Sequence, residues 1–329
     1  MKFSLPLLAV CLTQLVSAIP ASISKRAVTG YSTTASVGFA TQNGGTTGGS
    51  GGTVTTVTTL AALEAAVAGD EKKIVIISGT LTSTESEGVA VRPGSNTSIL
   101  GAQGATLVNI GIRIIDVSNV IVRGLTIQKV LASTDAIAIQ AATNVWIDHN
   151  DLSSDLDHDK DYYDGLLDIT HAADWVTVSY NYLHDHWKAS LVGHSDSNSA
   201  EDTGHLTVTY HHNYWKNLNS RGPSFRFGTG HIFNNYYDTL NDGINTRDGA
   251  QLLIENNVFV NTEDAIYSTD AGYAVATGND LGIGTNEALV GTITPSSLPY
   301  TYTLDTTSAV TSGVPTSAGA TVWFSSSTA

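Results

Sequence analysis

Val145-Trp-Ile-Asp-His-Asn150 is followed 31 positions later by Val176-Thr-Val-Ser-Tyr-Asn181, and both are short β-favouring runs closed by asparagine. Runs of the same shape end, in chain order, at Gly101, Gly124, Asn150, Asn181, Asn213, Asn235 and Asn257. Their shortest steps are 22 residues, which is roughly the length of one coil in a stacked repeat. The repeat therefore predicts a parallel β-helix, an all-β fold in which each coil adds one rung.

The closing glycines and asparagines have two expected uses. Both residue types tolerate the left-handed backbone that a turn between strands requires. Asparagines stacked on successive rungs can also hydrogen-bond to one another and to neighbouring backbone groups. A β-sandwich with irregular turns is the alternative, but seven closures in series are hard to obtain from hairpins.

The two longest steps, 31 and 32 residues, predict loops inserted into the coils at residues 155–164 and 184–201. Loops carried on a rigid scaffold are where binding and catalytic residues commonly lie. We therefore expect the functional site beside these two insertions, in a cleft along one side of the β-helix.

The ends of the repeat have different patterns. Residues 27–52 are small and polar, and residues 59–68 have the apolar spacing of a helix, with Thr59 as its cap. This helix would cover the open edge of the first coil, and residues 73–78 would form a buried strand. Residues 286–329 are rich in Ser, Thr and Pro, and we expect them to pack back over the β-helix or to be partly disordered.

The N-terminus predicts export from the cell. Residues 1–18 resemble a signal peptide, with Lys2, an apolar core and small residues at the cleavage point. Residues 19–26 are a possible pro-segment ending in Lys25-Arg26, although a surface pair is an equal alternative. The remaining residues, 27–329, would form one extracellular domain. The only cysteine, Cys11, lies in the signal, so the mature chain would have no disulfide.

Composition limits the possible partners. Removal of Lys2, Lys25 and Arg26 leaves 12 basic residues against 30 acidic ones, a net charge of −18. Such a chain is a poor candidate for nucleic acid, and no apolar run is long enough to span a membrane. A polyanionic substrate would need a local cationic patch, a bridging cation, or both. The sequon at Asn96 predicts N-glycosylation in a host that glycosylates.

One stretch combines acidic and basic residues beside the predicted loops. It contains Asp164-Gly-Leu-Leu-Asp168, then Lys188, then Arg221-Gly-Pro-Ser-Phe-Arg226. In a straight strand Asp164 and Asp168 would lie roughly 13 Å apart, too far for one ion, but Gly165 permits a bend. From spacing alone, a plain Asp-Gly turn is favoured over a metal site.

Four motifs in order, Val145-Trp-Ile-Asp-His149, Val176-Thr-Val-Ser-Tyr-Asn-Tyr182, Thr209-Tyr-His-His-Asn-Tyr214 and Arg221-x-Pro-x-x-Arg226, resemble those of secreted pectate lyases in the pectate/pectin lyase superfamily. The resemblance covers most of the mature chain. It implies a right-handed parallel β-helix and the calcium-dependent β-elimination of polygalacturonate.

The resemblance also implies roles for individual residues. Asp135, Asp164 and Asp168 would hold Ca²⁺, which prefers carboxylate oxygens and completes its shell with water. The family often has a further aspartate two residues before Asp135, where this chain has Ser133. A water or a substrate oxygen would then fill that position, or the site would be weaker.

The basic residues would act on the substrate. Lys188 and Arg226 would bind uronate carboxylates, with Lys160 and Lys216 as possible extensions of the patch. Arg221 would remove the proton from C5, although a guanidinium normally stays protonated. The alternative is an electrostatic role with water or hydroxide as the base. Either role predicts an alkaline optimum.

The remaining histidines and the Trp146-Asp148-His149 group are interpreted as structural. The group resembles a family hallmark, and a buried tryptophan beside a hydrogen-bonded Asp-His pair accounts for it without chemistry. Paired histidines such as His211 and His212 lack the cysteine or glutamate pattern of a zinc site.

Three other functions are compatible with the fold. A pectin lyase would act on esterified chains without calcium, a β-helix polygalacturonase would use two carboxylates as acid and base, and a wall-binding protein would not turn substrate over. The acidic residues, Lys188 and the two arginines favour the pectate lyase. We expect a monomeric enzyme with an open-ended cleft. It would cleave the polysaccharide at internal bonds.

Overall fold

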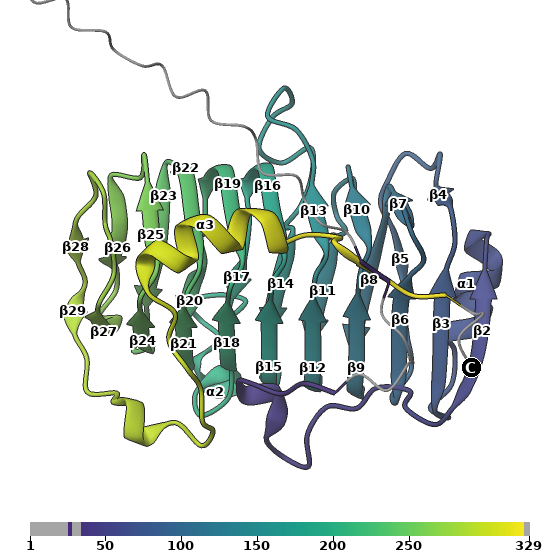
Figure 1. Cartoon of the computed structure of the whole chain (residues 1–329), viewed down its shortest axis with the longest axis horizontal. Helices are drawn as coiled ribbons and strands as arrows, with labels where there is room; N and C mark the ends of the chain where they lie inside the picture. Colours follow the sequence, from purple (N-terminus) through teal and green to yellow (C-terminus); the bar gives the residue numbers. More distant parts are fainter. Residues whose placement is uncertain (1–25, 28–33, 326–329) are drawn as a thin grey trace, which may run out of the picture.

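The structure, a computed structural model, describes residues 26–27 and 34–325. All but two of their strands form three parallel sheets that run along one axis (Figure 1). Successive strands of a coil enter the three sheets in turn, so that β12 (Thr143–Asp148), β13 (Asp151–Ser153) and β14 (Leu167–Thr170) each lie in a different sheet. The predicted parallel β-helix is confirmed.

The eleven-stranded sheet contains β2 (Thr53–Val57), β3 (Lys73–Ile77), β6 (Thr97–Gly101), β9 (Ser118–Arg123), β12, β15 (Asp174–Ser179), β18 (Thr207–His211), β21 (Thr229–Phe233), β24 (Gln251–Glu255), β27 (Tyr273–Thr277) and β29 (Leu289–Val290). The nine-stranded sheet contains β5 (Val89–Val91), β8 (Ile110–Ile115), β11 (Ile137–Gln140), β14, β17 (Leu191–Val192), β20 (Ser224–Arg226), β23 (Asp242–Arg247), β26 (Asp264–Ser268) and β28 (Asn286–Glu287). The eight-stranded sheet contains β4 (Thr80–Thr82), β7 (Thr106–Val108), β10 (Thr126–Gln128), β13, β16 (Tyr182–Lys188), β19 (Tyr214–Ser220), β22 (Tyr236–Leu240) and β25 (Val258–Val260).

In the interior of the β-helix, side chains of the same kind stack on one another in successive coils. In the nine-stranded sheet, Ile112, Ile137 and Leu167 occupy equivalent positions on three successive rungs and are fully buried. In the eight-stranded sheet, Trp215 and Tyr237 stack with ring centroids 5.7 Å apart. Burial of these aliphatic and aromatic side chains supplies the main driving force for folding.

The closing asparagines form a continuous ladder. The side-chain amide of each donates to the side-chain oxygen of the next at 2.9–3.1 Å, from Asn150 through Asn181, Asn213, Asn235 and Asn257 to Asn279. Each backbone N–H of the first five also donates to the next side-chain oxygen at 2.9 Å. The ladder therefore satisfies buried backbone groups at the turn between two sheets.

The prediction of left-handed backbone at these asparagines is wrong. The left-handed residue is the one before each of them, such as His149 at φ 52° and Tyr180 at φ 51°. Among the predicted closures only Gly124, at φ 75°, has that conformation. The asparagines are therefore required for their side chains and not for their backbone freedom.

The N-terminal cap agrees with the sequence. Helix α1 (Leu60–Val67) begins after Thr59, whose hydroxyl accepts from the Ala62 N–H. Leu63 and Val67 are buried, and α1 lies against β2 and β3 at the end of the β-helix (Figure 1). A short 3-10 helix, η1 (Phe39–Thr41), packs on β12, β15 and β18.

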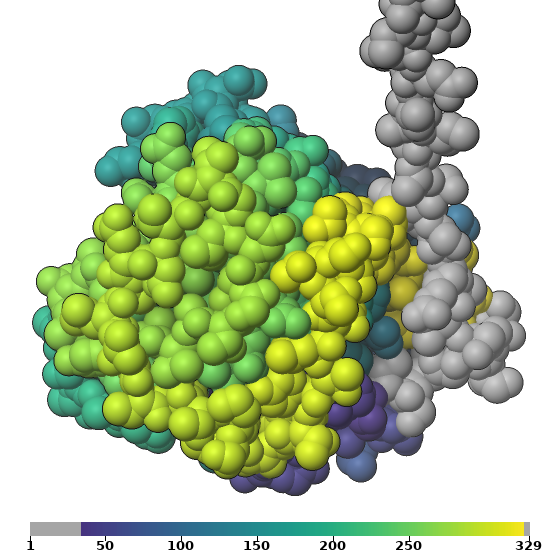
Figure 2. Space-filling model, turned by 60° about the vertical axis from the view of Figure 1, so that its left-hand side comes forward, coloured from purple at the N-terminus to yellow at the C-terminus, as the bar shows by residue number. Residues whose placement is uncertain are grey.

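The C-terminal segment packs back along the β-helix, as Figure 2 shows for the yellow surface. It includes the 3-10 helix η2 (Pro295–Ser297) and an unpredicted helix, α3 (Thr307–Ser317). Its Ser/Thr-rich sequence and internal Pro315 are unfavourable for a helix, but Val310 and Val314 are buried against β22 and β25. Tertiary packing therefore outweighs a weak local propensity.

Beyond α3 the chain reaches the N-terminal residues. Strand β30 (Val322–Trp323) pairs in parallel with β1 (Arg26–Ala27), which includes the second residue of the dibasic pair. The predicted signal, Cys11 and Lys25 lie outside the described residues, as does the end of the tail. None of the helices within 34–325 is long and apolar enough to span a membrane.

One predicted insertion is confirmed and the other is shorter than expected. Residues 155–164 form the loop between β13 and β14. Residues 184–192, by contrast, include most of β16 and all of β17, so only residues 193–206 leave the coil, with a short helix α2 (Ser199–Asp202). His184, His186 and Lys188 pair with residues of β19, but the loop prediction counted this stretch as insertion.

The asparagine ladder generates a stability prediction. Replacing Asn213, which is fully buried, by alanine leaves the Asn181 backbone and side-chain N–H groups without their acceptor. We expect Asn213→Ala to lower the unfolding free energy by about 3 kcal/mol, measured by chemical denaturation. Asn279→Ala, at the partly exposed end of the ladder, is the matched control, and it should lower the unfolding free energy by about 1 kcal/mol or less. Equal losses of unfolding free energy in the two variants would contradict a cooperative ladder.

Candidate functional site

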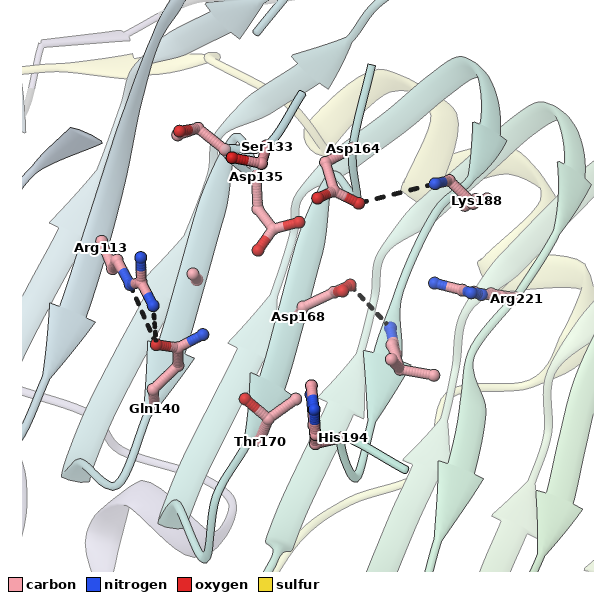
Figure 3. A pocket seen from close by; sticks show the side chains of 13 residues that line it. Arg113, Ser133, Asp135, Gln140, Asp164, Asp168, Thr170, Lys188, His194 and Arg221 are labelled. Atoms are coloured by element: carbon pink, nitrogen blue, oxygen red, sulfur yellow. Dashed lines mark hydrogen bonds and ion pairs between the residues drawn. The ribbon is translucent and has the colours of Figure 1, made fainter. Parts of the chain in front are cut away.

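A cavity of about 300 Å³ lies on the outer face of the nine-stranded sheet, beside the 155–164 loop (Figure 3). It is lined by Arg113, Ser133, Thr134, Asp135, Ala138, Gln140, Asp164, Asp168, Thr170, Lys188, Leu191, His194 and Arg221. Five of the six candidate catalytic, substrate-binding and metal residues predicted from the sequence are in this set.

The three aspartates come from two coils. Asp168 lies on β14 between the inward-pointing Leu167 and Ile169, and the Leu191 N–H donates to its carboxylate at 2.9 Å. Asp135 precedes β11 on the neighbouring rung, and Asp164 ends the inserted loop. The alternation of a strand therefore turns Asp168 outward, towards the other two carboxylates (Figure 3).

Gly165 allows the carboxylates to approach. Its N–H donates to Asp135 at 2.8 Å. A Cβ at this position would lie only 2.6 Å from an Asp168 oxygen and 2.9 Å from an Asp135 oxygen. Any larger residue would push the two carboxylates away, so the expected bend at Gly165 serves their convergence.

The electrostatics of the three aspartates favour the binding of a cation. Burial and the nearby Asp168 and Asp164 raise the pKa of Asp135 well above its usual value. Burial also raises the pKa of Asp168 to about 6, against the opposing charge of Arg221. The ionised forms of Asp135 and Asp168 would be stabilised by a hard divalent cation, which prefers oxygen ligands.

The protein does not close a metal cage by itself. Within the described ranges, no three His, Cys, Asp or Glu side chains are arranged to hold a metal ion alone. The donor chemistry fits Ca²⁺ provided that its remaining ligands come from water or a bound anion. Ser133 lines the cavity where a further carboxylate was expected.

Two cations stand on one side of the aspartates. Lys188, at the end of β16, lies 3.1 Å from Asp161 and 3.6 Å from Asp164. Arg221 lies between β19 and β20 with φ 66°, and its carbonyl accepts from the Ser190 N–H at 3.0 Å. No carboxylate of the described residues is within 4.0 Å of the Arg221 guanidinium.

Arg226 is placed differently from the other candidates. It is buried on β20 and does not line the cavity. Its Nε donates to Asp196 at 2.6 Å and lies 3.3 Å from Asp248, and its Nη1 donates to the Gly193 carbonyl. It therefore fastens the 193–206 loop in this structure.

The other predicted residues lie outside the cavity. Lys160 is on the exposed part of the 155–164 loop, and Lys216 lies 3.9 Å from Asp238. Asn96 is half-buried, and its side chain bonds to Asp70 and Asn119.

The Trp146-Asp148-His149 group belongs to the eleven-stranded sheet, not to this site. His149 lies 2.6 Å from Asp148, and the Trp146 indole donates to Ser179 at 2.9 Å. The hydrogen-bonded Asp-His pair beside the asparagine turn is as predicted.

Sequence reasoning missed Arg113, Gln140, Thr170 and His194. Arg113 aligns with Ala138 and Asp168 on successive rungs. Counting back from Asp168 by the steps between the closing residues, 31 and 26, leads to residues 137 and 111 instead, so the sequence repeat did not identify Arg113.

Comparison with known proteins gives consistent matches. A sequence model described as pectate lyase matches residues 11–322. Pectate lyase A of Aspergillus niger is 56% identical over 311 residues, covering 94% of this chain and 95% of the relative. Pectate lyase A of Emericella nidulans is 59% identical over 289 residues, 87% of each chain.

Solved structures agree. A Bacillus sp. N165 pectate lyase in complex with trigalacturonate superposes with a TM-score of 0.77 at 33% identity, covering 87% of this chain and 98% of that one. Pectate lyase II of Xanthomonas campestris gives 0.78 at 28% identity over the same shares.

The raised pKa of Asp168 generates a stability prediction. The carboxyl has a pKa of 3.8 in the unfolded chain and of about 6 in the folded one, so the folded protein loses stability as the pH rises from about 4 to 6, and the loss is complete above pH 6. In EDTA, Asp168→Asn should raise the unfolding free energy by about 1–3 kcal/mol at pH 8 and leave it nearly unchanged at pH 4. Denaturant titrations at both pH values measure this, with the exposed Glu263→Gln as control. A variant less stable than wild type at pH 8 would contradict it.

Proposed function

This chain belongs to the pectate lyase family and cleaves pectate by elimination, and we propose that Asp135, Asp164 and Asp168 serve this reaction with Ca²⁺ and that Arg221 is its base. The observation that carries the proposal is the pairing, in one cavity, of an acidic group with two cations. The acidic group suits a divalent cation, and Lys188 and Arg221 suit a uronate chain.

Asp135, Asp164 and Asp168 would hold the calcium ion in the cavity. When bound, the ion would withdraw electron density from a uronate carboxylate and so make the C5 proton more acidic. Ser133 makes the protein's share of the ligands smaller, which increases the share of the substrate.

Lys188 would neutralise the same carboxylate from the other side. Its ammonium already lies 3.6 Å from Asp164, so the cation and the acidic group share one face of the cavity. Charge that develops on the carboxylate as the C5 proton leaves is stabilised by a preorganised ammonium.

Arg221 would take the C5 proton. The C4–O4 bond then breaks, a C4–C5 double bond forms, and the leaving oxygen receives a proton. The support is that the Arg221 guanidinium has no carboxylate partner among the described residues and is free to face the substrate. An electrostatic Arg221 with hydroxide as the base is the alternative, and both require alkaline conditions.

Arg226 would bind a second uronate carboxylate after exchanging Asp196 for it. Asp196 is more than half exposed. Its carboxylate contacts the Arg226 Nε in the way that a uronate carboxylate would. This role requires movement of the 193–206 loop, unlike the role of Lys188.

We also propose that the protein is a secreted monomer, cut after residue 18 or 26 and glycosylated at Asn96. The support is the signal-like N-terminus and the sequon. Mass and N-terminal sequence of the protein recovered from culture medium test processing and glycosylation, and light scattering tests the monomer.

The first activity prediction concerns the base. Polygalacturonate with calcium at alkaline pH should give a rise in ultraviolet absorbance from the unsaturated product, and EDTA should abolish it. Arg221→Ala should lower kcat by about 10³-fold or more. Arg92→Ala, an exposed arginine outside the cavity, should change it little. Reducing ends without absorbance would instead indicate hydrolysis.

The second activity prediction concerns the metal site. Asp135→Asn and Asp164→Asn should each raise the calcium concentration for half-maximal activity by about tenfold or more, because each removes a charged ligand. Direct titration of the substrate-free variants with Ca²⁺ measures the same loss. The exposed Glu263→Gln serves as the control. Unchanged calcium dependence in both variants would remove these residues from the metal site.

A further inference from the structure

The cavity extends past the aspartates to a third cation, Arg113. Arg113 lies on β8, and its register partners are Ala138 on β11 and then Asp168 on β14. It therefore stands two rungs from Asp168, on the side away from Arg221 (Figure 3). The small Ala138 between them leaves the floor of the cavity low, so that a bound chain could lie across it.

Arg113 makes no ion pair within 4.0 Å among the described residues. Its Nε and Nη2 donate to the Gln140 side-chain oxygen at 2.9 and 2.7 Å, which is a neutral acceptor. Arg226 and Arg247, also on the nine-stranded sheet, each lie within 4.0 Å of two carboxylates. In a protein with twice as many acidic as basic residues, a fixed arginine without a carboxylate among the described residues is left for an anionic ligand.

An unpaired hydroxyl lies on the same floor. Thr170 lines the cavity at 4% exposure, and its hydroxyl has no hydrogen-bond partner among the described residues. It is the register partner of Gln140 on the next rung. A buried hydroxyl without a partner costs free energy unless a ligand satisfies it.

We propose that Arg113, held by Gln140, binds the carboxylate of a further galacturonate residue on the opposite side of the aspartates from Arg221, with the Thr170 hydroxyl bonding to the same sugar. The inference rests on the proposed function and extends its substrate site. The ligand is a free uronate carboxylate, because a methyl ester would remove the charge that a guanidinium recognises.

The position of this subsite determines which substrates use it. Four strand-to-strand steps separate β8 from β20, which follows Arg221, and at about 4.8 Å each they span about 19 Å. Only a chain of several sugars reaches from Arg221 to Arg113. The subsite therefore favours long, de-esterified chains over short oligomers.

The competing explanation is that Arg113 acts through the metal site, because its charge also opposes the raised pKa of Asp135. The two explanations predict changes in different kinetic quantities of an Arg113 variant. A subsite residue alters KM for long substrates at saturating calcium. A residue acting through Asp135 alters the calcium requirement and leaves KM at saturating calcium unchanged.

The test compares Arg113→Gln with wild type on polygalacturonate and on trigalacturonate, by ultraviolet absorbance at saturating calcium. We expect KM for the polymer to rise roughly tenfold, kcat to change much less, and the advantage of polymer over trimer to shrink. Arg113→Lys should recover part of the loss, because it keeps the charge without the planar fork. Arg92→Gln is the matched control.

Either of two results would overturn the inference. One is an equal rise in KM for trimer and polymer, and the other is an unchanged KM with a shifted calcium requirement. Wild-type protein without any absorbance change on polygalacturonate would refute the proposed function instead, so the two failures are distinguishable. A circular dichroism melt of Arg113→Gln that matches wild type excludes misfolding as the cause.

Discussion

The register between neighbouring coils is the constraint on which the rest of this structure depends. Parallel strands pair along the whole length of three sheets, and a ladder of six asparagines links the coils at one turn. Every ladder asparagine after the first accepts a backbone N–H from the coil before it, so a coil that slipped by one residue would leave buried donors unpaired. The ladder therefore fixes which residue of one coil lies over which residue of the next.

A fixed register is what allows residues distant in sequence to form one cavity. Arg113, Asp168 and Arg221 come from different coils, yet they face one side because strand alternation and coil stacking place them there. The 155–164 loop then adds Asp164 without disturbing the coil that carries it. The scaffold supplies position and the insertion supplies part of the chemistry.

The cavity is a place of unfavourable electrostatics within a stable fold. Burial makes the carboxylates of Asp135 and Asp168 hard to ionise, while no carboxylate in the described part of the chain lies within 4.0 Å of the Arg113 or Arg221 guanidinium. Elsewhere on the same sheet the pattern is the reverse, since Arg226 and Arg247 are paired with acids. Unsatisfied groups gathered in one cavity are typical of a binding site, where a cation and a polyanion would relieve both imbalances.

The sequence by itself determined the parallel β-helix and the capping helix after Thr59, because a repeat closed by Gly or Asn and a capped apolar spacing are local patterns. Five residues of the cavity were identified by the resemblance of the sequence motifs to those of a known family. The sequence did not determine helix α3, whose stability comes from Val310 and Val314 packing on strands β22 and β25, some 50 to 80 residues earlier. It also placed the left-handed backbone one residue too late, since side-chain bonding and backbone freedom both favour asparagine at a turn. Only the tertiary structure decided that Arg226 is engaged by Asp196 and that Arg113 is not engaged by any described carboxylate, because the partners of a charge depend on which coils and loops meet in space.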